Sequence, residues 1–194
     1  MAQPSPPADD ASDAALLARY ARGDMAAARV LTARLGPRIL GFATRMLSDR
    51  AEAEDVTQET MLRIWRIAPD WQAGQAQVAT WAFRVAANLC TDRLRKRRPV
   101  ALDTVAEPPD DTPGPVATLI AADREAALQA ALAALPDRQR QAVVLRHIEG
   151  LSNPEIAQIM DLGVEAVESL TARGKRALAA TLAGRRDELG YTDD

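Results

Sequence analysis

A proline-rich, acidic stretch divides this chain and limits what it can fold into. Residues 99–118 carry five prolines and four acidic side chains: Pro99, Pro108, Pro109, Pro113, Pro115, Asp103, Glu107, Asp110 and Asp111. This composition cannot pack a core and is typical of an extended linker. The alanine-rich segments on either side have helical periodicity and no run of alternating β-branched residues. The sequence therefore predicts an all-α fold of two small helical domains joined by an extended acidic linker.

The predicted domain boundaries follow from this division. The first residues are rich in proline, alanine and aspartate and have few large apolar groups, so they are expected to be disordered. The predicted segments are a disordered tail at 1–12, a first helical domain at 13–98, the linker at 99–118, a second helical domain with a helix-turn-helix at 119–186, and an acidic C-terminal end at 187–194.

Capping and breaking residues predict helix boundaries in the first domain. Ser12 or Asp13 is expected to cap the first helix, because both side chains accept hydrogen bonds from free N–H groups at a helix start. A second helix is expected over residues 25–35, with Gly36 and Pro37 interrupting it and beginning a third.

Several functional classes are disfavoured by the composition. A single cysteine rules out an internal disulfide and suits a reducing compartment. With one histidine and one cysteine there is no plausible zinc site, and we find no nucleophile–base pair or phosphate loop, so no enzyme activity, metal or cofactor is expected. No apolar run approaches the roughly 20 residues that span a membrane, and no signal peptide is evident. We expect a cytoplasmic protein without membrane insertion.

Residues 54–68 form an amphipathic segment with an acidic stripe on its polar side. The stripe consists of four residues at i, i+3, i+4 and i+7: Asp55, Gln58, Glu59 and Leu62. Residues with this spacing share one face of a helix. Such a face is often simply solvated, but an acidic stripe with a central leucine also suits a basic protein partner. Trp65 is expected to belong to the core.

Residues 80–97 form a second amphipathic segment that ends in a basic run. Its inner side contains Ala82, Val85, Ala86, Leu89 and Cys90, and Cys90 is expected to be an inert apolar residue. Its outer side aligns Arg84, Asn88, Thr91 and Arg95, flanked by Trp81, and the basic run comprises Arg93, Arg95, Lys96, Arg97 and Arg98. A basic helix end often only complements the helix dipole. Combined with the aligned polar residues, it indicates contact with a phosphate backbone. Trp81 suits either packing or base stacking.

The second domain contains a predicted helix-turn-helix. Ser152 and Glu155 have the spacing of a capping box, and Pro154 suits the first turn of the helix that follows. A short turn ending at Gly163 leads to a second helix, the arrangement that places a recognition helix in the major groove. Its predicted inner residues are Val167, Leu170, Gly174 and Leu178, and its outward residues are Glu165, Glu168, Ser169, Ala172 and Arg176, with Arg173 and Lys175 at the margins. A plain three-helix core is the alternative interpretation.

Two sets of motifs resemble the extracytoplasmic-function (ECF) group of the sigma-70 family of bacterial sigma factors. Asp55-Val-Thr-Gln-Glu-Thr-Met-Leu-Arg-Ile-Trp65, Thr80-Trp-Ala-Phe-Arg-Val-Ala-Ala-Asn-Leu89 and Asp92-Arg-Leu-Arg-Lys-Arg-Arg98 resemble its second conserved region. Ala134-Leu-Pro-Asp-Arg-Gln-Arg-Gln-Ala-Val143, Glu149-Gly-Leu-Ser152 and Glu155-Ile-Ala157 resemble its fourth. Where the family usually has Val-Lys-Ser-Arg in the recognition helix, this chain has Val167-Glu-Ser-Leu170, so two basic positions are lost.

The resemblance implies a non-catalytic transcription initiation factor whose partners are core RNA polymerase, promoter DNA and an anti-sigma factor. The implied polymerase-binding residues are Asp55, Gln58, Glu59 and Leu62. The implied −10 element residues are Trp81, Arg84, Asn88, Arg93, Arg95, Lys96, Arg97 and Arg98. The implied −35 element residues are Glu165, Glu168, Ser169, Ala172, Arg173, Lys175 and Arg176. The linker would lie in the polymerase's RNA-exit channel.

Two other functional classes remain as alternatives. A free-standing helix-turn-helix regulator with an N-terminal sensing or dimerisation domain would bind DNA tightly without polymerase, whereas the net charge of −3 predicts weak binding to free DNA. A sigma mimic that sequesters an anti-sigma factor would be expected to lack the aligned Arg84, Asn88 and Arg95.

Overall fold

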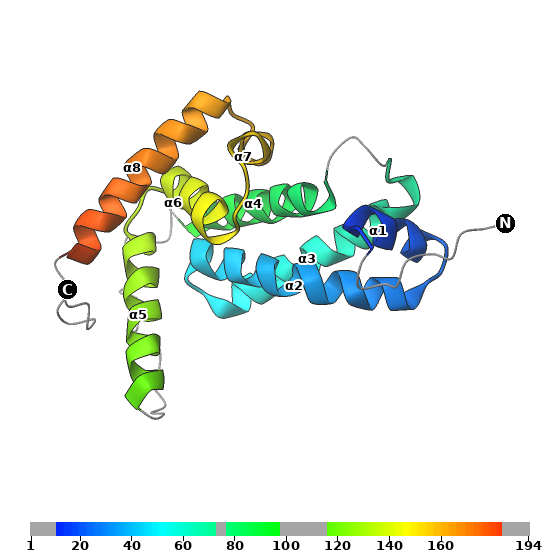
Figure 1. Ribbon diagram of the computed structural model, residues 1–194, viewed down its shortest axis with the longest axis horizontal. Coiled ribbons are helices and arrows are strands. Elements are labelled where there is room, and N and C mark those ends of the chain that lie inside the picture. The colour runs from blue at the N-terminus through cyan, green and yellow to red at the C-terminus, as the bar shows by residue number, and fades with distance from the viewer. Residues whose placement is uncertain (1–10, 73–76, 98–115, 184–194) are drawn as a thin grey trace.

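The computed structural model describes residues 11–72, 77–97 and 116–183, with side chains omitted over 116–122. These residues are almost entirely helical, which confirms the predicted all-α class (Figure 1). The elements are α1 (Asp13–Ala21), α2 (Met25–Leu47), α3 (Arg50–Ile67), the 3-10 turn η2 (Ala68–Asp70), α4 (Val78–Arg97), α5 (Val116–Ala133), α6 (Asp137–Val143), the π-helical η3 (Val144–Ile148), α7 (Asn153–Met160) and α8 (Val164–Ala183). No helix in the described ranges combines the length and apolarity needed to cross a bilayer.

The predicted caps are present at two helix starts. The Ser12 hydroxyl accepts a hydrogen bond from the Ala15 N–H at 3.2 Å at the start of α1. At the start of α7, the Glu155 carboxylate accepts from the Ser152 N–H at 2.8 Å and from its hydroxyl at 2.6 Å. Ala11, assigned to the disordered tail from sequence, is buried in the core.

The predicted break at Gly36 and Pro37 is wrong, because α2 runs unbroken through both residues. Proline inside a helix removes one backbone hydrogen bond and costs about 3 kcal/mol. Buried residues continue along one face on both sides of it, including Leu31 and Leu35 before it and Ile39 after it. Burying an apolar side chain of this kind contributes about 1.5–3 kcal/mol, so the continuous buried face outweighs the local interruption.

Several predicted segments lie outside the described residues. These are residues 1–10, the linker up to residue 115, Arg98, and the acidic C-terminal end. Residues 116–118, assigned to the linker from sequence, form the beginning of α5.

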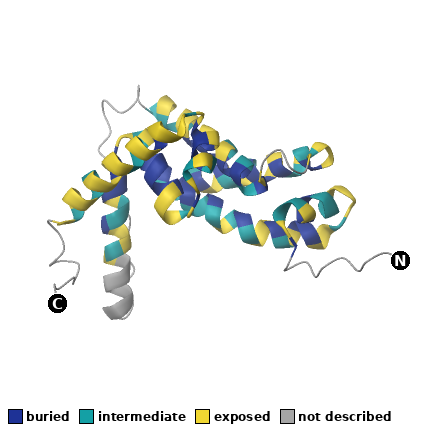
Figure 2. Cartoon of the chain, turned by 45° about the horizontal axis from the view of Figure 1, so that its top comes forward, coloured by how far each residue is buried: buried dark blue, intermediate teal, exposed yellow. Residues whose placement is uncertain are grey.

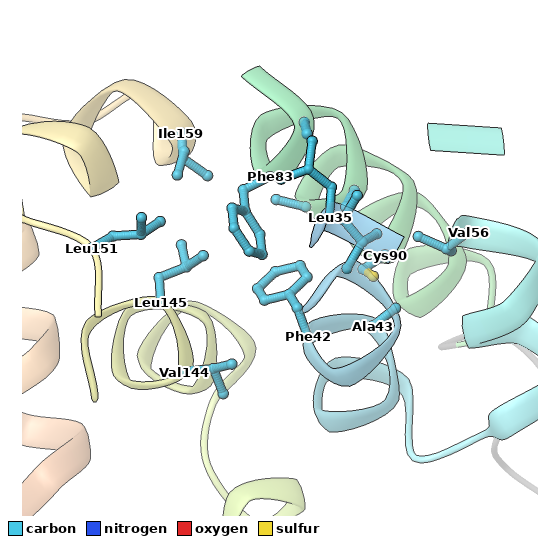
Figure 3. Close-up of a cluster of buried hydrophobic side chains, with 14 of the residues drawn as sticks. Leu35, Phe42, Ala43, Val56, Phe83, Cys90, Val144, Leu145, Leu151 and Ile159 are labelled. Atoms are coloured by element: carbon cyan, nitrogen blue, oxygen red, sulfur yellow. The ribbon is translucent and has the colours of Figure 1, made fainter. Parts of the chain in front are cut away.

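The two halves of the chain pack together around a continuous hydrophobic core. Helix α2 contacts α5 and α6, and α4 contacts α7. Figure 3 shows Phe42 and Phe83 from the first half near Leu145 and Ile159 from the second. The two phenylalanine rings meet edge to face, with centroids 5.7 Å apart. The linker therefore separates the halves in sequence but not in space.

Gly174 permits the close approach of α8 to α6 and is the subject of our first prediction. A Cβ at this position would lie 2.6 Å from Val143 Cγ2 and 3.3 Å from the Gln139 carbonyl oxygen. Gly174→Ala should therefore lower the melting temperature, because overpacking costs about 1–3 kcal/mol and the gain in helix propensity is at most about 1 kcal/mol. Gly36→Ala is the matched control in α2, where the nearest atom would be Thr32 Cγ2 at 3.9 Å. It should raise the melting temperature, and an equal rise for Gly174→Ala would contradict the packing argument.

Candidate partner and nucleic-acid interfaces

The acidic stripe of α3 is a surface feature, as its spacing predicts. Asp55, Gln58 and Leu62 are exposed and Glu59 is partly exposed, with Leu62 keeping 42% of its surface accessible. The Glu59 carboxylate accepts a hydrogen bond from Arg63 Nε at 2.8 Å, and this contact lowers the pKa of Glu59. The stripe thus combines carboxylates with an accessible leucine, and Glu59 remains ionised.

The outer face of α4 presents the polar line predicted from the sequence. Arg84, Asn88, Thr91 and Arg95 are all exposed. Arg95 forms a short-range ion pair with Asp92 at 3.0 Å. At that exposure the pair is worth little, so Arg95 can exchange it for a phosphate.

The basic run at the end of α4 divides into two groups. Lys96 is exposed, whereas Arg97 is half-buried, binds the end of α2 and forms an ion pair with Asp49 at 3.4 Å. Arg97 Nη1 donates to the Leu47 carbonyl at 2.8 Å and Nη2 lies 2.9 Å from Glu52 Oε1. Arg93 lies 3.8 Å from the same carboxylate. Arg97 would have to release a helix end and two carboxylates, Asp49 and Glu52, before contacting DNA, a cost that the sequence pattern did not show.

The tryptophans lie at the margin of the core. Trp81 is partly buried and meets Trp71 edge to face, with ring centroids 6.1 Å apart. Trp65 is also partly buried and packs on Tyr20 at 4.6 Å. Trp81 therefore packs against another ring while keeping part of its surface accessible beside the Arg84 face.

Helices α7 and α8 form the predicted helix-turn-helix. The predicted outward residues Glu165, Glu168, Ser169, Ala172 and Arg176 are exposed, as are Arg173 and Lys175, and α8 runs along the outside of the molecule (Figure 2). On its inner side Val167 and Gly174 are buried. Asn153 Nδ2 at the start of α7 donates to Glu168 Oε1 at 3.1 Å, which orients that carboxylate.

A cleft of about 610 Å³ lies between α4 and the second half. One wall contains Arg84, Asn88 and Thr91. The opposite wall contains Pro136, Asp137, Arg138, Gln141, Ile159, Met160 and Asp161. Sequence reasoning did not anticipate this juxtaposition, because helical periodicity identifies a polar face without identifying what lies opposite it.

Comparison with known proteins decides the family. The sequence patterns of sigma-70 region 2 and sigma-70 region 4 match residues 31–100 and 125–178. The RNA polymerase sigma-H factor of Pseudomonas aeruginosa is 32% identical over 181 residues, covering 88% of this chain and 93% of that protein. The ECF RNA polymerase sigma-E factor of Haemophilus influenzae is 30% identical over 182 residues, covering 88% and 95%. The chain belongs to the ECF sigma factors of the sigma-70 family.

Solved ECF sigma factors share the fold. The structure of CnrH in complex with the cytosolic domain of CnrY matches with a TM-score of 0.68 at 28% identity, covering 89% of this chain and 97% of that one. The structure of RpoE from Bartonella quintana in complex with the anti-sigma factor NepR matches with a TM-score of 0.62 at 23% identity, covering 78% and 94%, a likeness of fold alone. In this sigma factor, the α3 stripe and the α4 face lie in region 2, and α7 and most of α8 lie in region 4.

Cys90 provides a test of how firmly α4 is packed. It is fully buried on the inner side of the helix, and burial raises the pKa of its thiol to about 12. Because the thiolate is the reactive species, Cys90 should react with a disulfide reagent at pH 8 orders of magnitude more slowly than in unfolded protein. Comparison of the labelling rates with and without denaturant measures this, and rapid native labelling would contradict the packing of α4.

Proposed function

We propose that this ECF sigma factor binds core RNA polymerase and directs initiation at a specific class of promoters from within the cytoplasm. The observation that carries the proposal is the joint presence of region 2 and region 4 on one chain, each with its predicted outer face exposed. The region 2 match also disfavours a free-standing regulator, since that alternative requires a sensing or dimerisation domain in the first half.

The two halves have different tasks in this proposal. The α4 face, with Arg84, Asn88 and Arg95, contacts the non-template strand of the −10 element, where backbone contacts and stacking on aromatic groups suit single-stranded DNA. Helix α8 enters the major groove of the −35 element, where the base pairs present distinguishable donor and acceptor patterns. Neither half is expected to catalyse a reaction.

An anti-sigma factor is the proposed regulatory partner. The related CnrH forms a complex with the cytosolic domain of CnrY. A partner that covers the α3 stripe or the α4 face of this chain would block polymerase or promoter binding by the same surfaces.

Run-off transcription tests the proposal directly. Core polymerase is incubated with a library of promoter fragments with and without the full-length protein. The proposal predicts transcripts from a defined subset of promoters that share −10 and −35 sequences, only when the protein is present. Absence of any protein-dependent transcript across the library would overturn the proposal.

The α3 stripe should be the main polymerase-docking surface. Reversing Asp55 and Glu59 together to lysine should abolish co-purification with core polymerase, because positive charge would replace the acidic face opposite a basic partner. Both side chains lie on the surface, so the helical circular dichroism should be unchanged. Reversing the exposed Asp70 and Asp123 to lysine makes the same change in net charge elsewhere and should leave binding intact. If both double variants bound core polymerase equally well, the α3 stripe would not be the main polymerase-docking surface.

The recognition helix should read a cytosine through a carboxylate. Acidic side chains in the major groove accept hydrogen bonds, most naturally from cytosine N4, and Asn153 orients Glu168 for this contact. Glu168→Ala should relax preference at one base pair of the −35 element by about 1–3 kcal/mol. Glu165 is the second candidate residue for this contact with cytosine.

Arg173→Ala is the comparison variant for Glu168→Ala. The Arg173 guanidinium is exposed, so we expect it to bind a phosphate group or, alternatively, a guanine. We expect the same of Lys175 and Arg176. In the phosphate case Arg173→Ala should weaken binding to all sequences alike and reduce its salt dependence. Transcription from a set of −35 variants shows whether Glu168→Ala changes the preference at one base pair and whether Arg173→Ala lowers transcription from all variants alike. The same uniform loss in both variants would mean that α8 contacts only the backbone.

A further inference from the structure

The only histidine of the chain lies beside two cations at the edge of the helix-turn-helix. His147 belongs to η3, the element before α7, and its side chain is exposed. Arg146 precedes it and is also exposed. Arg146 Nη1 donates to the Leu151 carbonyl at 2.9 Å, which holds the guanidinium beside the turn that leads into α7.

The packing of α8 on α6 places Lys175 next to this pair. Gly174 of α8 approaches α6 so closely that a Cβ there would lie 2.6 Å from Val143 Cγ2. His147 follows Val143 by four residues, so it lies about one turn further along the same side of the helix. Lys175 is adjacent to Gly174, and its charge acts on His147. Arg146, His147 and Lys175 therefore form one surface group, here called the His147 cluster.

The His147 cluster lies where a DNA backbone would pass. A recognition helix presents its outward face to the bases of the major groove, whereas phosphate contacts come from side chains around that face. Lys175 is at one margin of α8, between the outward residues Ala172 and Arg176 and the buried Gly174. Arg146 and His147 continue this margin onto η3.

The surroundings of His147 favour its neutral form in the free protein. Partial burial lowers the pKa of His147, and the positive charges of Lys175 and Arg146 lower it further. In the described part of the chain, these two cations are the charged groups that act on the imidazole. The carboxylates on and around η3 are engaged with other groups: Asp137 with Arg140, Glu149 with Arg38, and Glu155 with Ser152. A phosphate beside the cluster would supply the negative charge that favours the imidazolium.

We propose that His147 is a proton-coupled phosphate contact of region 4, which binds the DNA backbone as an imidazolium together with Arg146 and Lys175. The inference deepens the proposed function, because it rests on α8 being the helix that enters the −35 duplex. Duplex binding then takes up a proton, so it should strengthen as the pH falls through the range in which a histidine changes charge.

Nuclear magnetic resonance tests the proposal on the wild-type protein. The imidazole Cε1–H signal of the full-length, untagged chain is followed between pH 5 and 8, alone and with an excess of a short mixed-sequence duplex at low ionic strength. With a single histidine, the signal needs no assignment. DNA should move the titration midpoint to higher pH. A midpoint that DNA leaves unchanged or lowers would overturn the proposal.

Two variants test whether the charge of His147 contacts phosphate. The affinity for the same duplex is measured by fluorescence anisotropy as a function of salt. For the wild type, the slope of log affinity against log salt should be steeper at low pH than at high pH by up to about 0.9, the value of one phosphate contact. His147→Gln cannot be protonated and should give the shallow slope at both pH values. His147→Lys stays charged and should give the steep slope at both. An equal pH dependence in the wild type and His147→Gln would overturn the proposal.

A lysine pair tests the composition of the cluster. Lys175→Gln should raise the titration midpoint of His147 in the free protein, because a neighbouring positive charge is removed. Lys96→Gln removes an exposed lysine from α4 in region 2 and should leave the midpoint unchanged. Equal midpoints in these two variants would remove Lys175 from the cluster and overturn the shared contact.

Run-off transcription decides the proposed function separately. Promoter-specific transcripts combined with a His147 midpoint that does not respond to DNA would retain the function and reject the proton-coupled contact. A midpoint that responds to DNA without any protein-dependent transcript would retain the contact and reject the proposed function.

Discussion

A single buried guanidinium connects the ends of two helices and with them the two halves of the molecule. Arg140 is 7% exposed, and its nitrogens donate to four backbone carbonyls at 2.6–3.2 Å. These belong to Leu132 and Ala133 at the end of α5, to Leu135 just after it, and to Met46 at the end of α2. Carbonyls at a helix end lack intrahelical partners and carry the negative end of the helix dipole. Burial lowers the pKa of Arg140, and the carbonyl contacts compensate for the lost hydration.

The end of α2 is where side chains from both regions meet. Arg97 of α4 donates to the Leu47 carbonyl, and Gln129 of α5 donates to the Thr44 carbonyl and to the Ser48 hydroxyl. Water can replace the polar contacts from region 4 when the halves separate, so each contributes only modest net free energy. The buried apolar contact around Phe83 contributes more to holding the two halves together.

Local signals in the sequence predicted the helices better than they predicted how the helices pack. Ser12, Ser152 and Glu155 act within one turn of the chain, so their capping roles could be inferred directly. Pro37 was misread because the buried face of α2, which depends on the surrounding core, outweighs a local break. The π-helical turn that begins at Val144 has no such local signal, since apolar spacing over five residues does not distinguish it from an α-helix.

The exposure of the site residues could be predicted from helical periodicity, whereas the interdomain contacts could not be predicted. The α3 stripe and the outward face of α8 need only a helical repeat, and both are exposed as expected. Arg140 and Glu149 look like surface residues in the sequence, and they become buried because they lie at the junction between the two halves. No local sequence pattern indicates which polar face will pack against another part of the chain. Arg97 likewise belongs to a basic run in sequence but binds a helix end in the fold.

The joint core of the two halves is the central claim, and chemical denaturation of the free protein tests it most directly. All three tryptophans, Trp65, Trp71 and Trp81, lie in the first half, so their fluorescence reports that half alone. Far-ultraviolet circular dichroism reports helices in both halves. A single core predicts that the two signals follow one coincident transition with the same midpoint and slope. A separate circular-dichroism transition that leaves tryptophan fluorescence unchanged would show that region 4 unfolds on its own and would contradict the account.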